Sequence, residues 1–121
     1  MPSTVRLVNA VFYAHHGVMP EEHRVGRRFE VDVAIEVDFT AAALADDLSA
    51  TVDYERVYQI ARRVVTEQKV YLIERLALLI AREVGAAFPD ATAVEVTVRK
   101  PDPPVGGTVS RAEVTMRHEQ G

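Results

Sequence analysis

The chain has 121 residues, of which 48% are hydrophobic and 26% charged, and its formal net charge at pH 7 is −4. This length predicts one domain over residues 1–121, and the composition is that of a folded globular protein rather than a disordered chain. The sequence contains no cysteine, which excludes disulfides, thiolate catalysis and zinc sites that need cysteine. The acidic charge, without an offsetting Lys/Arg cluster, argues against nucleic-acid binding.

Apolar stretches in the chain are too short to cross a membrane. The strongest one, at 72–81, is interrupted by Glu74 and Arg75, and no 18-residue span is apolar enough. The first six residues lack the basic start and apolar run of a signal peptide. We therefore expect a cytoplasmic protein that has no membrane partner.

Two strands are predicted in the first third of the chain. Residues 3–13 are rich in Val, Leu, Phe and Tyr, which favours a strand. Over 28–39, apolar side chains at odd positions alternate with mostly acidic ones at even positions, a period of two that is typical of a half-buried strand. The polar face of this second strand is acidic, so we expect it to meet water or basic partners.

The hydrophobic period then changes from two to that of a helix. Over 54–67 apolar residues recur at i, i+3, i+4 and i+7, and Asp53 is predicted to cap this helix. After a break at 68–71, the same spacing predicts a second helix over 72–87, and Pro89 marks its end.

Alternation returns over 94–98 and, more weakly, over 109–117, which predicts two final strands. The order ββ-αα-ββ predicts an α+β fold: a four-stranded antiparallel sheet with two antiparallel helices on one face. Open edges of this length favour association unless they are paired. We therefore expect a homo-oligomer in which sheets join edge to edge.

Lys100 interrupts an apolar pattern in the third predicted strand. It has the parity of Val94 and Val98, which places it on the apolar face. If the strand ends at Arg99, the lysine simply reaches solvent. If it does not, the ammonium is partly desolvated and suited to proton transfer, with Pro101 fixing the backbone beside it.

Two further candidates lie where helices are predicted to start. Glu74 complements the helix dipole there or anchors a ligand, since one carboxylate accepts two parallel N–H bonds from an amidine-like heterocycle edge. Tyr54 belongs to the apolar stripe of its helix or transfers a proton from the helix N-terminus. From the residues alone, both alternatives stay open for each side chain.

The polar segment 15–23 is rich in His and Glu, but we do not expect it to bind a metal. Adjacent histidines on an extended chain point to opposite sides, and neither H-x-x-x-H nor H-E-x-x-H is present. We instead predict a turn at His16 and Gly17, with Glu22 free for acid–base or binding work. His118 is predicted to be solvated.

Four motifs, in order, resemble those of dihydroneopterin aldolases. They are His16-Gly17-Val18 with Glu22 and 26–33, then 46–48 with 51–54, then 72–77 (the family's LIExLA segment), and 98–101 (its V-x-K-P segment). The resemblance covers about residues 5–117. It implies the family's tunnelling fold, which is similar to the ββ-αα-ββ order.

The resemblance implies a lyase of folate biosynthesis that cleaves 7,8-dihydroneopterin into 6-hydroxymethyl-7,8-dihydropterin and glycolaldehyde. Acid–base catalysis suffices without a Schiff base, metal or cofactor, because the substrate's own N5=C6 imine accepts the electrons. Family members form rings of four subunits that stack into octamers, with sites at subunit interfaces. A tetrameric ring or an octamer is therefore expected here.

The resemblance also implies roles for individual residues. Lys100 is the expected general acid/base, Tyr54 assists proton transfer, and Glu22 is the loop carboxylate that serves both catalysis and binding. Glu74 and the backbone of Ile73 are expected to grip the 2-amino and N3 edge of the pterin. The remaining expected substrate-binding residues are Val18, Val52 and Leu72.

Two alternatives to cleavage are considered. The first is an epimerase that acts at C2′ of dihydroneopterin or of its triphosphate, for which Arg24, Arg27 and Arg28 supply basic side chains. The second is a pterin-binding or structural oligomer without catalysis. The joint presence of the acid–base and pterin-gripping candidates named above weighs against the second.

Overall fold

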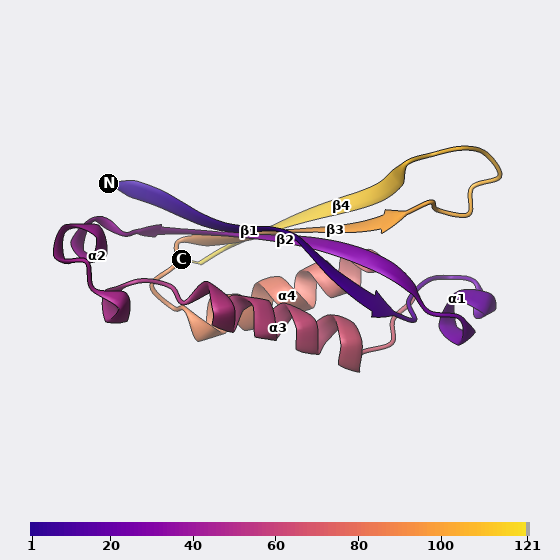
Figure 1. Ribbon diagram of the computed structural model, residues 1–121, viewed down its shortest axis with the longest axis horizontal. Coiled ribbons are helices and arrows are strands. Elements are labelled where there is room, and N and C mark those ends of the chain that lie inside the picture. The colour runs from indigo at the N-terminus through magenta and orange to yellow at the C-terminus, as the bar shows by residue number, and fades with distance from the viewer. Residues whose placement is uncertain (121) are drawn as a thin grey trace.

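The computed structural model describes residues 1–120 as an open four-stranded sheet with two long helices on one face (Figure 1). The strands pair antiparallel in chain order: β1 (Pro2–Ala14), β2 (Arg27–Asp38), β3 (Ala93–Pro101) and β4 (Arg111–Glu119). Helices α3 (Tyr54–Glu67) and α4 (Ile73–Ala87) lie between β2 and β3 in the chain and run in opposite directions. The predicted α+β fold with the order ββ-αα-ββ is confirmed.

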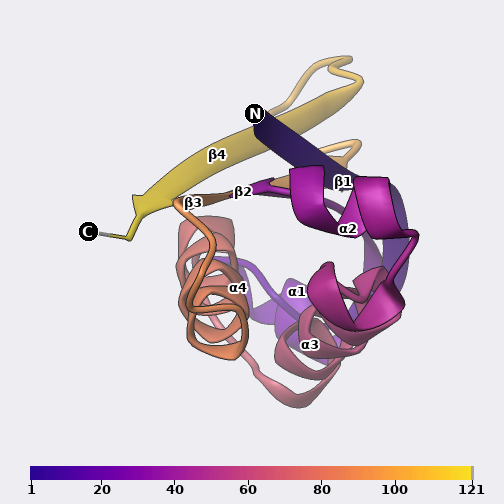
Figure 2. The ribbon, with the colours of Figure 1, turned by 90° about the vertical axis from the view of Figure 1, so that its left-hand side faces the viewer.

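The core lies between the sheet and these two helices, and the alternation of β2 supplies much of it. Phe29, Val31 and Ile35 are each at most 1% exposed, and every second residue of β3 is buried with them. Helix α3 packs on β1, and α4 packs on β3 and β4 (Figure 2). Asp53 caps α3 as predicted, since its Oδ1 accepts a hydrogen bond from the Glu55 N–H at 3.0 Å.

The acidic face of β2 meets arginines of its own sheet. Asp32 accepts two hydrogen bonds from Arg99 of β3, at 2.8 and 2.6 Å. Glu36 accepts two from Arg117 of β4, at 3.1 and 2.6 Å. The expectation of basic partners is met within the chain, because cross-strand neighbours on one face are close enough to pair.

Three short elements were not predicted from the sequence: α1 (Pro20–Arg24), α2 (Thr40–Ala45) and a 3₁₀ turn at Leu48–Ala50. Segments of three to six residues are too short to show a hydrophobic period. The prediction that Phe39 belongs to the second strand is wrong, because Phe39 precedes the first turn of α2. The last strand begins and ends two residues later than the predicted range 109–117.

The short elements separate the two ends of the molecule. Figure 1 shows α1 and the β3–β4 connection at one end, and α2 with the start of α3 at the other. The sheet order leaves β1 and β4 as its two edges in a single chain. Within residues 1–120, no helix is long and apolar enough to span a membrane.

Candidate functional site

Lys100 lies inside β3 and on the helix-covered face of the sheet. The strand continues to Pro101, so the alternative that it ends at Arg99 and releases the lysine to solvent is wrong. The Lys100 side chain is 12% exposed, and its Nζ forms an ion pair with the carboxylate of Glu22. A lysine that is this buried needs such a partner.

Glu22 is held in this position by α1. Its Oε1 accepts a hydrogen bond from the Met19 N–H at 3.2 Å, and Arg27 Nη1 lies 3.6 Å from its Oε2. Burial favours the neutral carboxyl, but Lys100, the Met19 N–H and Arg27 together hold the pKa of Glu22 below its ordinary value. Glu22 is therefore a buried, ion-paired carboxylate rather than the free loop side chain that the sequence predicted.

Gly17 makes room for this carboxylate. Its φ is +143°, and a Cβ at this position would lie 2.4 Å from the carboxyl carbon of Glu22. A side chain here would meet both backbone strain and a clash. Glycine is therefore required at the predicted His16–Gly17 turn, because the backbone there lies directly against the Glu22 carboxylate.

A cavity of about 280 Å³ opens beside this ion pair. Its lining comes from the segment before α1 and from α1 itself, from the segment that leads into α4 with the first turn of α4, and from Lys100 and Pro104. Six of the eight predicted site residues line it: Val18, Glu22, Leu72, Ile73, Glu74 and Lys100. Glu74 lies at the positive end of the α4 dipole, so it both complements that dipole and faces the cavity.

His16 connects the segment before α1 to the backbone between α3 and α4 through hydrogen bonds. The Val70 N–H donates to its Nδ1 at 3.1 Å, so Nε2 carries the proton and donates to the Val65 carbonyl at 2.7 Å. The Gly17 N–H also donates to the Val70 carbonyl, at 3.1 Å. His16 is 0% exposed, and desolvation lowers the pKa of its imidazole. It is a neutral core residue that fixes the connection before α4.

Tyr54 and Val52 lie away from this cavity. Tyr54 is the first residue of α3, and Val52 lies two residues before it. The 14 residues of α3 then span about 20 Å toward the α1 end of the molecule. Tyr54 is 62% exposed, so the interpretation that it packs in the apolar stripe of α3 is wrong. Val52 is 7% exposed and packs in the core instead.

Other sequence expectations are modified by the structure. His118 is half-buried, because its strand position turns it toward α4, where its ring lies near Gly85. Of the arginines considered for a triphosphate, Arg28 faces the opposite side of the sheet and pairs with Glu30 at 2.8 Å. Arg27 turns inward to Glu22.

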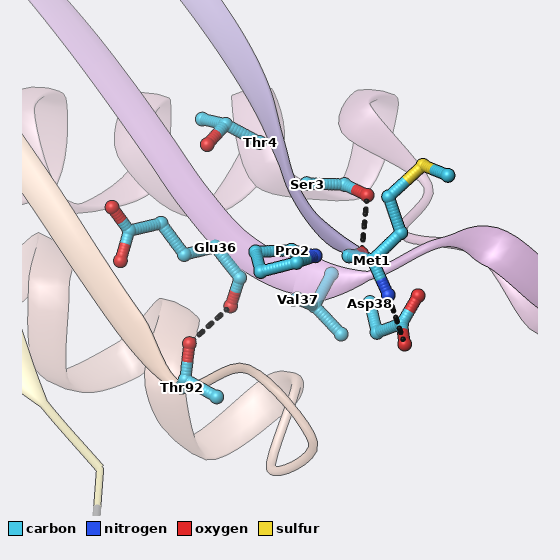
Figure 3. A pocket seen from close by; sticks show the side chains of 8 residues that line it. All are labelled: Met1, Pro2, Ser3, Thr4, Glu36, Val37, Asp38 and Thr92. Atoms are coloured by element: carbon cyan, nitrogen blue, oxygen red, sulfur yellow. Dashed lines mark hydrogen bonds and ion pairs between the residues drawn. The ribbon is translucent and has the colours of Figure 1, made fainter.

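A second hollow lies at the opposite end of the sheet and has a different character. Figure 3 shows the amino group of Met1 paired with Asp38 at 3.0 Å and the Thr92 hydroxyl donating to the Glu36 carbonyl at 3.1 Å. None of the predicted site residues lines this hollow. Across residues 1–120, no group of three or more His, Asp or Glu side chains is arranged to hold a metal ion.

Comparison with solved structures identifies the fold. The dihydroneopterin aldolase of E. coli in complex with neopterin matches with a TM-score of 0.88 at 21% identity, over 96% of this chain and 98% of that one. A dihydroneopterin aldolase from Burkholderia bound to guanine matches with a TM-score of 0.81 at 23% identity, over 99% and 93% of the two chains. The fold is thus the tunnelling fold that the sequence predicted.

Sequence comparison identifies the family to which the chain belongs. The dihydroneopterin aldolase of Bacillus subtilis (strain 168) is 41% identical over 96 residues, which cover 79% of this chain and 80% of the relative. The family model described as dihydroneopterin aldolase matches residues 5–117. The chain therefore belongs to the dihydroneopterin aldolase family, as the motif resemblance predicted.

Sequence reasoning missed the part that Arg27 and His16 play around the cavity. A signal for Arg27 was present, because it has the odd-numbered parity of the apolar residues of β2. His16 carried no such signal. Its partners Val65 and Val70 are backbone groups 49 and 54 residues away, which no side-chain pattern reveals.

Proposed function

We propose that the cavity beside Lys100 is where this aldolase of folate biosynthesis cleaves 7,8-dihydroneopterin into 6-hydroxymethyl-7,8-dihydropterin and glycolaldehyde. The proposal is based chiefly on the buried Lys100–Glu22 ion pair, which lines the same cavity as the exposed Glu74. An acid–base group and a polar anchor that face one small cavity are what a cofactor-free cleavage requires.

Glu74 supports binding of the pterin ring. A carboxylate can accept two parallel N–H bonds from the 2-amino and N3 edge, which fixes the orientation of a flat heterocycle. Neopterin and guanine, the ligands of the two solved structures, share this edge. The backbone of Ile73 and the apolar side chains of Val18 and Leu72 form the neighbouring cavity surface.

Lys100 supports the proton transfers. Cleavage removes the proton of the 2′-hydroxyl, breaks the C1′–C2′ bond, and moves the bonding electrons into the N5=C6 imine, where N5 gains a proton. Glycolaldehyde leaves, and C1′ then gains a proton as N5 loses one. Lys100 and ordered water carry out these transfers, with Glu22 as the counter-ion of the ammonium. Orientation by Glu74 supplies the alignment that the bond cleavage needs.

Tyr54 completes the proposed site from a second copy of the chain. It is exposed at the end of α3 remote from the cavity, and both edges of the sheet are open. A homo-oligomer, either a ring of four or an octamer, brings Tyr54 of one copy to the cavity of the next. We place the reaction in the cytoplasm, which suits a chain without cysteine.

The test is incubation of the purified protein with 7,8-dihydroneopterin in the absence of oxygen and the presence of EDTA, followed by chromatography. We expect 6-hydroxymethyl-7,8-dihydropterin and glycolaldehyde in equal amounts. A C2′ epimer beside them identifies an intermediate that recaptures glycolaldehyde before it leaves. Unchanged substrate, from protein that is folded and assembled, contradicts the proposal.

A further inference from the structure

Arg27 occupies a position in the sheet that is unusual for an arginine. It is the first residue of β2 and has the parity of buried Val31, so its side chain lies on the helix-covered face. Its Nη2 donates to the carbonyl groups of Pro101 and Asp102, the latter at 2.8 Å, while Nη1 lies 3.6 Å from Glu22. One guanidinium therefore contacts both the end of β3 and the carboxylate of the proposed site.

The carbonyl contacts fix the point at which β3 ends. Asp102 has a φ of +48°, and its N–H donates to the Ser110 carbonyl at 3.1 Å. Pro104, two residues further along, lines the cavity. Because the planar guanidinium binds two successive carbonyl groups, Arg27 restricts both the strand end that carries Lys100 and the cavity wall that follows it.

The charges at the cavity come from four elements: Glu22 on α1, Arg27 on β2, Lys100 on β3 and Glu74 on α4. His23, also on α1, is occupied by a backbone carbonyl that lies 2.5 Å from its Nε2. Within residues 1–120, the ion pairs of Glu22 are those with Lys100 and Arg27. A lysine changes charge when it transfers a proton, whereas a guanidinium stays charged.

We propose that Arg27 is a positioning residue of the aldolase site: it fixes the end of β3 and remains the counter-ion of Glu22 while Lys100 transfers its proton. The inference rests on the proposed role of Lys100. In that transfer an Nζ–H bond breaks, its electron pair stays on Nζ, and the proton forms a bond to the substrate. Glu22 stays a carboxylate throughout, because Arg27 still offsets its charge.

Three variants separate the charge of Arg27 from its geometry. Arg27→Gln removes the charge and leaves only a single, shorter amide donor for the carbonyl groups, whereas Arg27→Lys retains the charge and loses the planar fork. Arg28→Gln is the matched control, because Arg28 is the next residue of β2 and pairs with Glu30 on the opposite face. For each assembled protein, kcat and KM for 7,8-dihydroneopterin are measured from about pH 3.5 to about pH 10, so that the acid limb set by Glu22 is covered, together with the thermal unfolding midpoint.

We expect Arg27→Gln to move the acid limb of the kcat/KM profile to higher pH, since loss of a neighbouring cation raises the pKa of Glu22. The kcat of this variant falls roughly tenfold as the end of β3 loses one of its contacts. Arg27→Lys keeps the acid limb in place but also loses roughly tenfold in kcat, because an ammonium cannot hold both carbonyl groups and Glu22. Arg28→Gln changes neither quantity.

The inference is overturned if folded Arg27→Gln has the same pH profile as Arg28→Gln, even when its unfolding midpoint falls, since that result describes a merely structural arginine. If Arg27→Gln does not fold, Arg27→Lys decides, and an unchanged kcat overturns the positioning role. A parallel Lys100→Gln variant separates the two proposals. Full activity of that variant, or no activity of the parent protein, contradicts the proposed function instead.

Discussion

Arg99 and Lys100 are neighbours on β3 and yet belong to different environments. Arg99 lies on the open face of the sheet and donates two hydrogen bonds to Asp32, so its charge is fully matched by a cross-strand partner. Lys100 lies on the helix-covered face, where Glu22 pairs with it beside a cavity. The same contrast separates Arg28 from Arg27 on β2.

The comparison shows that the sheet uses its two faces for different purposes. On the open face, charges pair within the sheet, where water screens them and each pair contributes little to stability. On the helix-covered face, a few charges are desolvated and arranged around one carboxylate, which is costly unless they have a function. Substitutions on the two faces should test this difference, from the largest effect to the smallest.

The largest effect on activity is expected from a substitution of Lys100 on the helix-covered face. We expect Lys100→Gln to lower kcat by roughly a hundredfold or more, because acid–base groups contribute about that much, while the protein still folds and assembles. The matched control is Arg99→Gln on the opposite face, which is expected to retain kcat. Turnover of 7,8-dihydroneopterin and the oligomer mass are measured for both. Equal activities of the two variants would remove the functional distinction between the faces.

The helix-covered side also contains the buried imidazole of His16, which hydrogen-bonds the backbone next to the cavity. We expect His16→Leu to lower the free energy of unfolding by about 2–4 kcal/mol, because the Val70 N–H and the Val65 carbonyl each lose a buried partner. His16→Gln restores much of this, since an amide can accept from one group and donate to the other. Urea unfolding at pH 7.5 measures both. Equal losses for the two variants would show that shape rather than hydrogen bonding matters at this site.

The pH dependence of stability, compared between the parent protein and His16→Gln, tests whether His16 is neutral. The pKa of His16 is lowered in the folded state, so between that value and the unfolded value of about 6.5 the unfolded chain binds more protons. Stability that is fully present above about pH 6.5 is therefore lost as the pH falls. We expect the parent protein to lose more stability than His16→Gln between pH 7.5 and pH 5.5. Parallel curves would contradict a neutral His16.

The smallest effects are expected on the open face. Asp32→Asn should lower the free energy of unfolding by roughly 1 kcal/mol at pH 7, because Asp32 is only 18% exposed and binds Arg99 through both oxygens. Glu36→Gln, which disturbs the more exposed pair with Arg117, should have less effect. Urea unfolding measures the free energy of unfolding of both variants. A larger loss for Glu36→Gln than for Asp32→Asn would contradict the expected order.

Acid should remove the effect of Asp32→Asn. Arg99 holds the pKa of Asp32 below its ordinary value against the opposing effect of burial. Its contribution is therefore present above the unfolded pKa of about 3.9 and is lost as the pH falls through the lower, folded value. The stabilities of Asp32→Asn and the parent protein should converge on acidification, and curves that stay apart would show that the carboxylate charge is not the cause.

Much of the architecture follows from local pattern. The alternation over 28–39 identifies β2, and the helical spacing over 54–67 and 72–87 identifies α3 and α4 to within one residue at each end. The predicted bounds fail where the period is weak. The strand predicted at 109–117 is displaced by two residues, and helices of five or six residues leave no readable period.

The sequence by itself determined the family and the order of the elements, because motifs and periods of two and 3.6 are properties of the chain. It gave Lys100 the parity of the apolar face but left open whether the strand reaches that far. Only the tertiary structure decided that Glu22 is buried against Lys100, that His16 is a neutral link between the cavity walls, and that Arg27 faces inward. The contacts of Glu22 with Lys100, of His16 with Val65 and Val70, and of Arg27 with Asp102 join residues about 50 to 80 positions apart, so they exist only once the sheet and helices have packed.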